Sequence, residues 1–150
     1  MESIIKIIKD LNKKKLPLGG VCAIGNFDGV HLGHQLILKK LKKDSKDLKA
    51  PSIVLTFDPH PLKVLYPNKE IKLLYPKEKK YELISKFSID FLLEIPFDLN
   101  FSKLSPEEFV KNLLIEKLKI KKVLVGSNFY FGYQKEGNFK TLKKLGKKYG

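Results

Sequence analysis

Short apolar runs alternate with segments of helical periodicity along the whole 150-residue chain. The predicted strands are residues 21–25, 53–57, 89–95 and 123–125. The predicted helices are residues 3–11, a helix from 31 that stops at 44–45, 77–87, one that starts after 105 and runs to about 118, and 139–148. This alternation is typical of an α/β fold in which helices connect parallel strands. Because no repeat, low-complexity tract or linker interrupts it, we expect one domain.

Local signals refine several of these segments. Ser105, Pro106 and Glu108 have the spacing of a helix start, with a serine cap, a proline in the first turn and a glutamate that completes a capping box. The apolar stripe expected after this start is Phe109, Val110, Leu113, Leu114 and Leu118. The stripe expected on the helix from 31 is Leu32, Leu36, Ile37, Leu38 and Leu41. Leu142 and Leu145 should face inward on the last helix. Residues 62–76 contain turn signals and are predicted to form a flap-like loop.

The composition limits the class of protein. A hydrophobic content of 43% suffices for a core. The one cysteine, Cys22, excludes an internal disulfide and lies in an apolar run, which favours a buried small side chain over a nucleophile. The first ten residues mix charge with apolar side chains too closely for a signal peptide, and no run reaches membrane-spanning length. We therefore expect a cytoplasmic protein without a membrane partner.

The net charge is +14, and all 30 basic residues are lysines. Such a charge attracts anions, including nucleotides. The lysines are dispersed over predicted helix faces, whereas a nucleic-acid groove would more often include arginine for bidentate contacts. The sequence therefore argues against nucleic acid as a partner, and it leaves the oligomeric state open.

The junction at residues 25–34 joins the first predicted strand to a helix through glycines and two histidines, His31 and His34. A helix start offers free backbone N–H groups to an anion, and the two imidazoles would share one face of the first turn. Gly33 lies between them and lets a phosphate approach the backbone. The alternative is a tight turn in which the histidines only cap or decorate the helix.

Two further segments place polar and aromatic residues where predicted strands stop, at residues 56–61 and 125–132. Ligands of open parallel sheets bind outside the carboxyl ends of the strands. The three strand ends together favour nucleotide chemistry.

These segments resemble the three signatures of the FMN adenylyltransferase module of bacterial FAD synthetases. The sequences that carry the resemblance are GNFDGVHLGHQ at 25–35, TFDPHP at 56–61 and VGSNFYFG at 125–132. LSPEEF at 104–109 is similar to the family's helix before the last strand, and the resemblance covers about residues 4–145. It implies a Rossmann-like nucleotidyltransferase fold over residues 1–150. It also implies transfer of AMP from ATP to FMN, giving FAD and pyrophosphate, with Mg²⁺ required.

The resemblance also implies roles for individual residues. His31 and His34 would bind the ATP phosphates and stabilise charge at the α-phosphorus. The expected phosphate and nucleotide pocket is Gly25, Phe27, Asp28, Gly29 and Gly33. The expected flavin side is Asp58, Pro59, His60 and Pro61. Asn128 would hold the flavin phosphate or a magnesium ion, with Phe129 and Phe131 near the isoalloxazine ring.

Several of these residues have a structural alternative. Asp28 could instead cap the following helix. His60 could be a histidine of a proline-flanked turn. Phe129 and Phe131 could belong to the core, which is the more probable role for Phe129.

The chain departs from the family at its end, because the Ser/Thr-rich segment ending in Ile-Arg and the riboflavin kinase domain would both follow Gly150. We expect a nucleotidyltransferase domain truncated at its C-terminus, without riboflavin kinase activity. One alternative is a catalytically incomplete module that binds flavin or nucleotide. Another is a related nucleotidyltransferase with the same histidine motif and a different phosphate acceptor, although TFDPHP belongs to the flavin branch.

Overall fold

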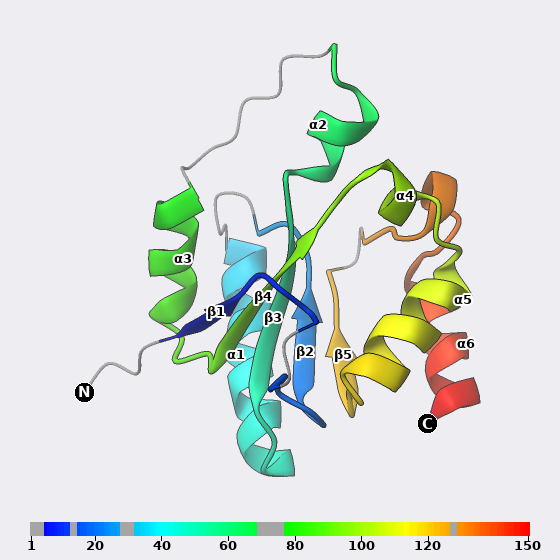
Figure 1. Cartoon of the computed structure of the whole chain (residues 1–150). Coiled ribbons are helices and arrows are strands. Elements are labelled where there is room, and N and C mark those ends of the chain that lie inside the picture. The colour runs from blue at the N-terminus through cyan, green and yellow to red at the C-terminus, as the bar shows by residue number, and fades with distance from the viewer. Residues whose placement is uncertain (1–4, 13–14, 28–31, 69–76, 127–128) are drawn as a thin grey trace.

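The computed structural model describes residues 5–12, 15–27, 32–68, 77–126 and 129–150. Within them five parallel strands form one sheet in the order β1-β4-β3-β2-β5. The strands are β1 (Lys6–Ile8), β2 (Val21–Ile24), β3 (Ser52–Asp58), β4 (Phe91–Pro96) and β5 (Lys122–Leu124). The predicted α/β fold, a parallel sheet flanked by helices, is confirmed. The carboxyl ends of the strands lie at the upper edge in Figure 1.

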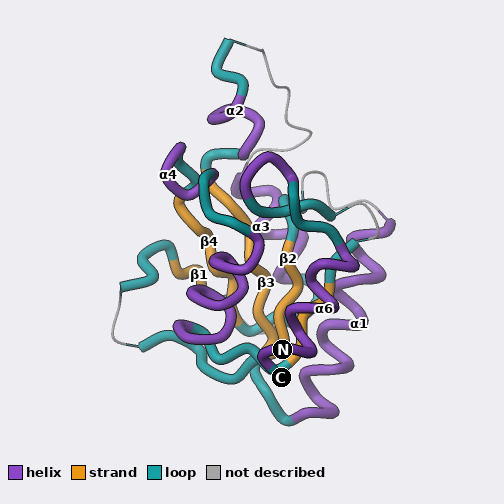
Figure 2. The backbone as a smooth tube through the Cα atoms, turned by 90° about the vertical axis from the view of Figure 1, so that its right-hand side faces the viewer, coloured by secondary structure: helices purple, strands orange, loops and turns teal. Residues whose placement is uncertain are grey.

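The helices cover both faces of the sheet. They are α1 (Leu32–Leu48), α2 (Pro61–Leu65), α3 (Lys77–Ser85), α4 (Leu99–Ser102), α5 (Pro106–Glu108), the π-helix η1 (Phe109–Lys117), the 3₁₀ turn η2 (Tyr133–Lys135) and α6 (Phe139–Tyr149). Helices α1 and α3 lie on one side of the sheet, and η1 and α6 on the other (Figure 1). Helix α2 stands beyond the carboxyl edge of the sheet in both views (Figures 1 and 2).

Alternate strand residues feed the two layers of the core, because successive side chains of a strand point to opposite faces. Those packed with α1 and α3 are Val21, Ala23, Val54 and Leu92. Those packed with η1 and α6 are Cys22, Ile24, Ile53, Leu55, Leu93 and Ile95. The strands are therefore apolar on both faces, as expected of a parallel sheet covered by helices. The buried position predicted for Cys22 is confirmed, and burial raises the pKa of its thiol.

The capping box predicted at Ser105 is confirmed. Its side chain accepts a hydrogen bond from the Glu108 N–H at 3.1 Å, and the Glu108 carboxylate accepts one from the Ser105 N–H at 3.3 Å. The helix then widens to π-type bonding, in which the Leu118 N–H donates to the Leu113 carbonyl at 3.0 Å. The predicted stripe from Phe109 to Leu118 is buried, as are Leu142 and Leu145 on α6.

Four expectations were wrong. Part of the predicted helix at 3–11 is strand β1, in which Lys6 lies opposite Phe91 of β4. The predicted loop at 62–76 contains most of α2, while residues 69–76 lie outside the described residues. Helix α1 continues through residues 44–45 to Leu48. Leu32 and Leu36 are 71% and 59% exposed, because only the later part of α1 packs on the sheet, through Leu38 and Leu41.

Candidate active site

The turn that leaves β2 brings Phe27 against His34 of α1. Phe27 is 1% exposed, and its ring centroid lies 5.1 Å from that of the His34 imidazole, with the planes tilted by 56°. The Phe27 backbone has a φ of 51°, a left-handed conformation that is uncommon for a bulky residue. Strained backbone of this kind concentrates at functional sites. The structure thus gives His34 a buried aromatic neighbour at the carboxyl edge of the sheet.

Gly25 allows the chain to fold back in this way. A Cβ at this position would lie 3.2 Å from Cε2 of Phe27, and the Gly25 N–H donates to the Leu55 carbonyl at 3.1 Å. The glycine predicted to shape the pocket therefore permits a close approach between the turn and the ring.

The backbone carbonyl of Asn26 is held by two side chains from other elements. It accepts a hydrogen bond from Lys80 Nζ of α3 at 3.0 Å and one from Thr56 Oγ1 of β3 at 3.3 Å. The Asn26 side-chain oxygen is buried and accepts no hydrogen bond from the described residues. It is an acceptor that a substrate or a water molecule could use.

Beside Lys80, the hydroxyl of Tyr81 donates to the carboxylate of Glu94 on β4. Glu94 is 3% exposed, and Thr56 is fully buried opposite it in the β3–β4 register. A polar cluster therefore lies between α3 and the carboxyl ends of β3 and β4.

Some predicted site residues lie outside the described residues, and their roles stay predictions: His31, Asp28, Gly29 and Asn128. His34 and Gly33 lie in the first turn of α1, with His34 half-buried and Gly33 exposed. The structure thus brings Gly25, Phe27, Gly33 and His34 together around the β2–α1 turn.

The segment Asp58 to Pro61 connects β3 to α2. The Asp58–Pro59 peptide bond is cis, and Asp58 and Pro59 are exposed. His60 caps α2, because its Nδ1 accepts a hydrogen bond from the Leu62 N–H at 3.2 Å, and Pro61 is the first helical residue. His60 thus has the structural role considered above, that of a histidine in a proline-flanked turn. Contact of this segment with flavin stays a prediction.

Phe129 and Phe131 stack at 5.6 Å with planes 12° apart. Phe131 is 7% exposed and its ring lies 5.5 Å from that of Phe109, while Phe129 packs on the same core cluster. Both rings therefore pack in the core, which was the structural alternative for them. Their contact with a flavin stays a prediction.

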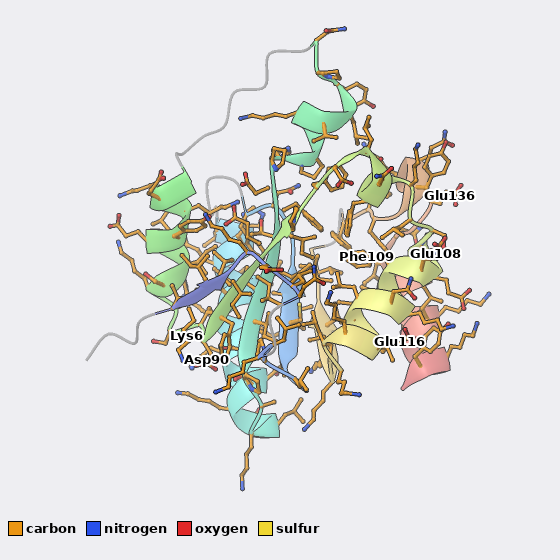
Figure 3. All side chains as sticks on the ribbon, in the orientation of Figure 1. Lys6, Asp90, Glu108, Phe109, Glu116 and Glu136 are labelled. Carbon is orange, nitrogen blue, oxygen red and sulfur yellow. The ribbon has the colours of Figure 1, made fainter. Side chains whose placement is uncertain are left out.

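A hollow of about 420 Å³ opens beside this core, at the carboxyl ends of β3 and β4. It is lined by Leu65, Tyr66, Phe97, Phe101, Ser102, Leu104, Phe109, Gly132, Tyr133, Gln134 and Lys135. Figure 3 shows Phe109 beside Glu108, where α5 continues into η1. Phe97, Phe101 and Phe109 contact one another in sequence, with ring centroids 5.6 Å and 6.0 Å apart. The volume and the aromatic wall fall within the range of sites that bind small molecules.

The described residues include no group of three His, Cys, Asp or Glu side chains that could hold a metal ion. Protein sites for Mg²⁺ commonly use few protein ligands and several substrate oxygens. The described side chains do not form a metal site of their own.

Sequence reasoning missed Lys80, Tyr81 and Glu94 as parts of the site. Lys80 is one of 30 lysines and lies beside Lys79, so nothing in the sequence distinguishes it. Glu94 did carry a signal, because it interrupts the apolar residues 91–95 of a predicted strand, and a buried carboxylate needs a partner.

A family model for FAD synthetase matches residues 13–150. The chain belongs to the FAD synthetase family. It is 40% identical over 146 residues to the bifunctional riboflavin kinase/FMN adenylyltransferase of Buchnera aphidicola subsp. Schizaphis graminum, covering 97% of this chain and 47% of that protein. It is 34% identical over 148 residues to the protein of the same name from Escherichia coli K12, with the same coverage. The family resemblance seen in the three signatures is thus confirmed, and the chain spans about half the length of these curated relatives.

The fold is shared with the crystal structure of a macrolide-efflux protein from Streptococcus pneumoniae, with a TM-score of 0.81 over 95% of this chain and 47% of that one. At 24% identity this match shows the fold alone. Within the part of the chain that the structure describes, no helix has both the length and the apolar character needed to span a membrane.

Proposed function

We propose that the chain is an FMN adenylyltransferase domain over residues 1–150, which transfers AMP from ATP to FMN and releases FAD and pyrophosphate. Membership of the FAD synthetase family supports this activity. The observation that carries it in the structure is the packing of His34, in the first turn of α1, against Phe27 at the carboxyl end of β2. In open α/β sheets this edge is where ligands bind.

The reaction needs little from the protein beyond positioning and charge stabilisation. A phosphate oxygen of FMN attacks the α-phosphorus of ATP, a new P–O bond forms, and the bond to the β-phosphate breaks as pyrophosphate leaves. The attacking phosphate is already ionised near neutral pH, so no general base is required. His31 and His34 would donate hydrogen bonds to the oxygens that gain charge, beside the N-terminus of α1.

The substrates would occupy two sides of the carboxyl edge. Gly25, Phe27, Asp28, Gly29 and Gly33 would form the phosphate and nucleotide side in this proposal. The hollow of about 420 Å³ would take the isoalloxazine ring, with Phe131 behind its wall and the segment from Asp58 to Pro61 leading into α2. Asn128 would contact the flavin phosphate or the ion. Mg²⁺ would be carried by the phosphates of ATP. We place the protein in the cytoplasm.

The proposal is tested with the double variant His31→Ala/His34→Ala. Loss of a preorganised donor to a developing oxyanion typically lowers kcat by about 100-fold or more. We expect FAD formation, followed by chromatography, to fall by at least that factor, while circular dichroism shows an unchanged fold. Turnover at the wild-type rate in this variant would refute the roles of the histidines.

A second candidate is a module that binds flavin or nucleotide without turnover. The two candidates are separated by measuring FMN fluorescence and FAD formation on the same sample. Quenching of FMN without FAD supports the module, and FAD supports the enzyme.

A further inference from the structure

We propose that Lys80 is a positioning residue that holds the backbone of Asn26 and Phe27, just after β2, in the shape that orients His34. The inference rests on the proposed function, because it concerns the same site. Lys80 lies on α3, 54 residues along the chain from Asn26, whose carbonyl it contacts.

Among the described residues, Lys80, Thr56 and the Asn26 carbonyl all contact one another. Its ammonium donates to the Asn26 carbonyl at 3.0 Å and to Thr56 Oγ1 at 3.3 Å. The Thr56 hydroxyl in turn donates to the same carbonyl at 3.3 Å. A hydrogen bond from an ammonium is about twice as strong as a neutral one, so Lys80 is the stronger of the two donors on this carbonyl.

The orientation of the Asn26 carbonyl governs the next residue. The peptide unit is planar, so fixing the direction of this carbonyl fixes the plane that carries the Phe27 nitrogen. Rotation about the adjacent N–Cα bond is the φ of Phe27, which has the strained value of 51°. Without the hold on the carbonyl, the turn can relax and carry the Phe27 ring away from the His34 imidazole.

Helix α3 is itself fixed to the sheet beside Lys80. The neighbouring Tyr81 donates to buried Glu94, and Ile84 is fully buried among residues of β2, β3 and α1. Figure 1 shows α3 alongside α1 on this side of the sheet. These contacts fix the backbone of α3 at Lys80. The lysine side chain can therefore hold the Asn26 carbonyl at a defined distance from α3.

The test compares Lys80→Met, which keeps the length of the side chain and removes its charge, with Lys79→Met. Lys79 is the preceding lysine, is exposed, and pairs with Glu82 on the same helix at 3.9 Å. The chain has three histidines, so the ring resonances in a ¹H–¹³C spectrum can be assigned with a His34→Gln variant. We expect the His34 resonances to move in Lys80→Met and to match wild type in Lys79→Met.

The same variants are assayed for FAD formation. A misplacement of about 1 Å can lower a rate by about 100-fold, so we expect kcat of Lys80→Met to fall about 10-fold to 100-fold with little change in KM. Unchanged His34 resonances in Lys80→Met would overturn the proposal. A raised KM for ATP with His34 resonances unmoved would instead mean that Lys80 binds substrate directly, which also overturns it.

The spectrum is read without substrates, so the two proposals fail separately. A wild-type chain that makes no FAD refutes the proposed function, while the His34 resonances still decide the role of Lys80. If Lys80→Met does not fold, Lys80→Gln replaces it, since a shorter amide suits a half-buried polar position. Failure of both variants to fold would contradict a local positioning role.

Discussion

Phe27 combines a left-handed backbone with a side chain that is 1% exposed. Its ring packs with Leu38, Leu41 and the apolar side chains of β2 and β3, in addition to His34. The contacts of the ring with this core, together with the hydrogen bonds from Lys80 and Thr56 to the Asn26 carbonyl, offset the strain of the backbone, which is of the order of 1–3 kcal/mol.

We therefore predict that Phe27→Ala lowers the free energy of unfolding by about 3–5 kcal/mol, as removal of a buried phenylalanine typically does. Urea denaturation measures the loss. The matched control is Phe139→Ala, because Phe139 is 53% exposed at the start of α6. Equal losses in the two variants would show that the Phe27 ring is not part of the core.

Single site residues could be predicted from the sequence where the residue type itself limits the possible roles, and could not where the residue type is common. Gly25 and His34 were singled out because glycines and histidines join a predicted strand to a helix at residues 25–34, and two further strand ends carry polar and aromatic residues. Lys80 was not, because its role depends on which of many lysines the fold of α3 brings to Asn26. Contacts between residues distant in the chain have no local signature.

The hydrogen bonds at the start of α5 contribute to the stability of the fold. The capping box at Ser105 begins the helical segment that continues as η1 and buries Phe109, Val110, Leu113 and Leu114. We predict that Ser105→Ala lowers the free energy of unfolding by about 1 kcal/mol, since the Glu108 N–H loses its acceptor. Urea denaturation of Ser85→Ala is the control, because Ser85 lies at the end of α3 and its hydroxyl donates to the Glu82 carbonyl instead of capping a helix start. An equal effect at Ser85 would contradict a specific capping role.

Asp44 ties α1 to the edge strand β5. Its carboxylate lies 3.0 Å from Lys122 Nζ and 3.4 Å from Lys40 Nζ. The hydrogen bond from Lys122 lowers the pKa of Asp44, burial of the carboxylate opposes this, and the charges of both lysines add to the lowering. A carboxyl group whose pKa is lowered by folding contributes stability above its ordinary pKa of 3.8, and that stability is lost as the pH falls through the lower folded value.

We predict that Asp44→Asn lowers the free energy of unfolding at pH 7 by about 1 kcal/mol, a modest value because both lysines remain in contact with water. Below the ordinary pKa of Asp44 the difference from wild type should shrink, because the wild-type carboxyl group becomes protonated. Denaturant titrations at a series of pH values measure this. Asp47→Asn, at an exposed position on the same helix, is the control for the change of residue type at pH 7. A gap between Asp44→Asn and wild type that stays constant on acidification would refute the assignment.

Elements with strong local signals were predicted well, and those that depend on distant pairing were not. The Ser105 cap, β3 and α6 carry their own signals, which are a capping box, a continuous apolar run and amphipathicity. Strand β1 was taken for a helix because its isoleucines and lysines fit either period over so few residues. Pairing with β4 makes this segment a strand. The Lys6 N–H donates to the Asp90 carbonyl at 3.1 Å.

At the scale of the molecule, the three signatures converge because parallel strands end at one edge of the sheet. The fold class could be predicted from alternation alone, since few architectures accommodate strands and helices in turn. The hollow could not, because its wall is assembled from segments after β3, after β4 and around η2.

The hollow can be tested through Tyr133, which lines it and is 42% exposed. If the hollow takes the flavin ring, Tyr133→Ala should weaken FMN binding by about 2-fold to 12-fold, the equivalent of one aromatic contact of about 0.5–1.5 kcal/mol. Fluorescence titration of FMN gives the Kd. Tyr130→Ala is the control, since Tyr130 is 57% exposed and lies outside the lining. Equal Kd values for the two variants would place the flavin elsewhere.

The most direct test of the proposed activity is incubation of the purified chain with FMN, ATP and Mg²⁺, followed by chromatography of the flavins and an assay of pyrophosphate. The account predicts FAD and pyrophosphate in equal amounts, and neither product when ATP is omitted. A folded chain that binds FMN and ATP but forms no FAD would contradict it.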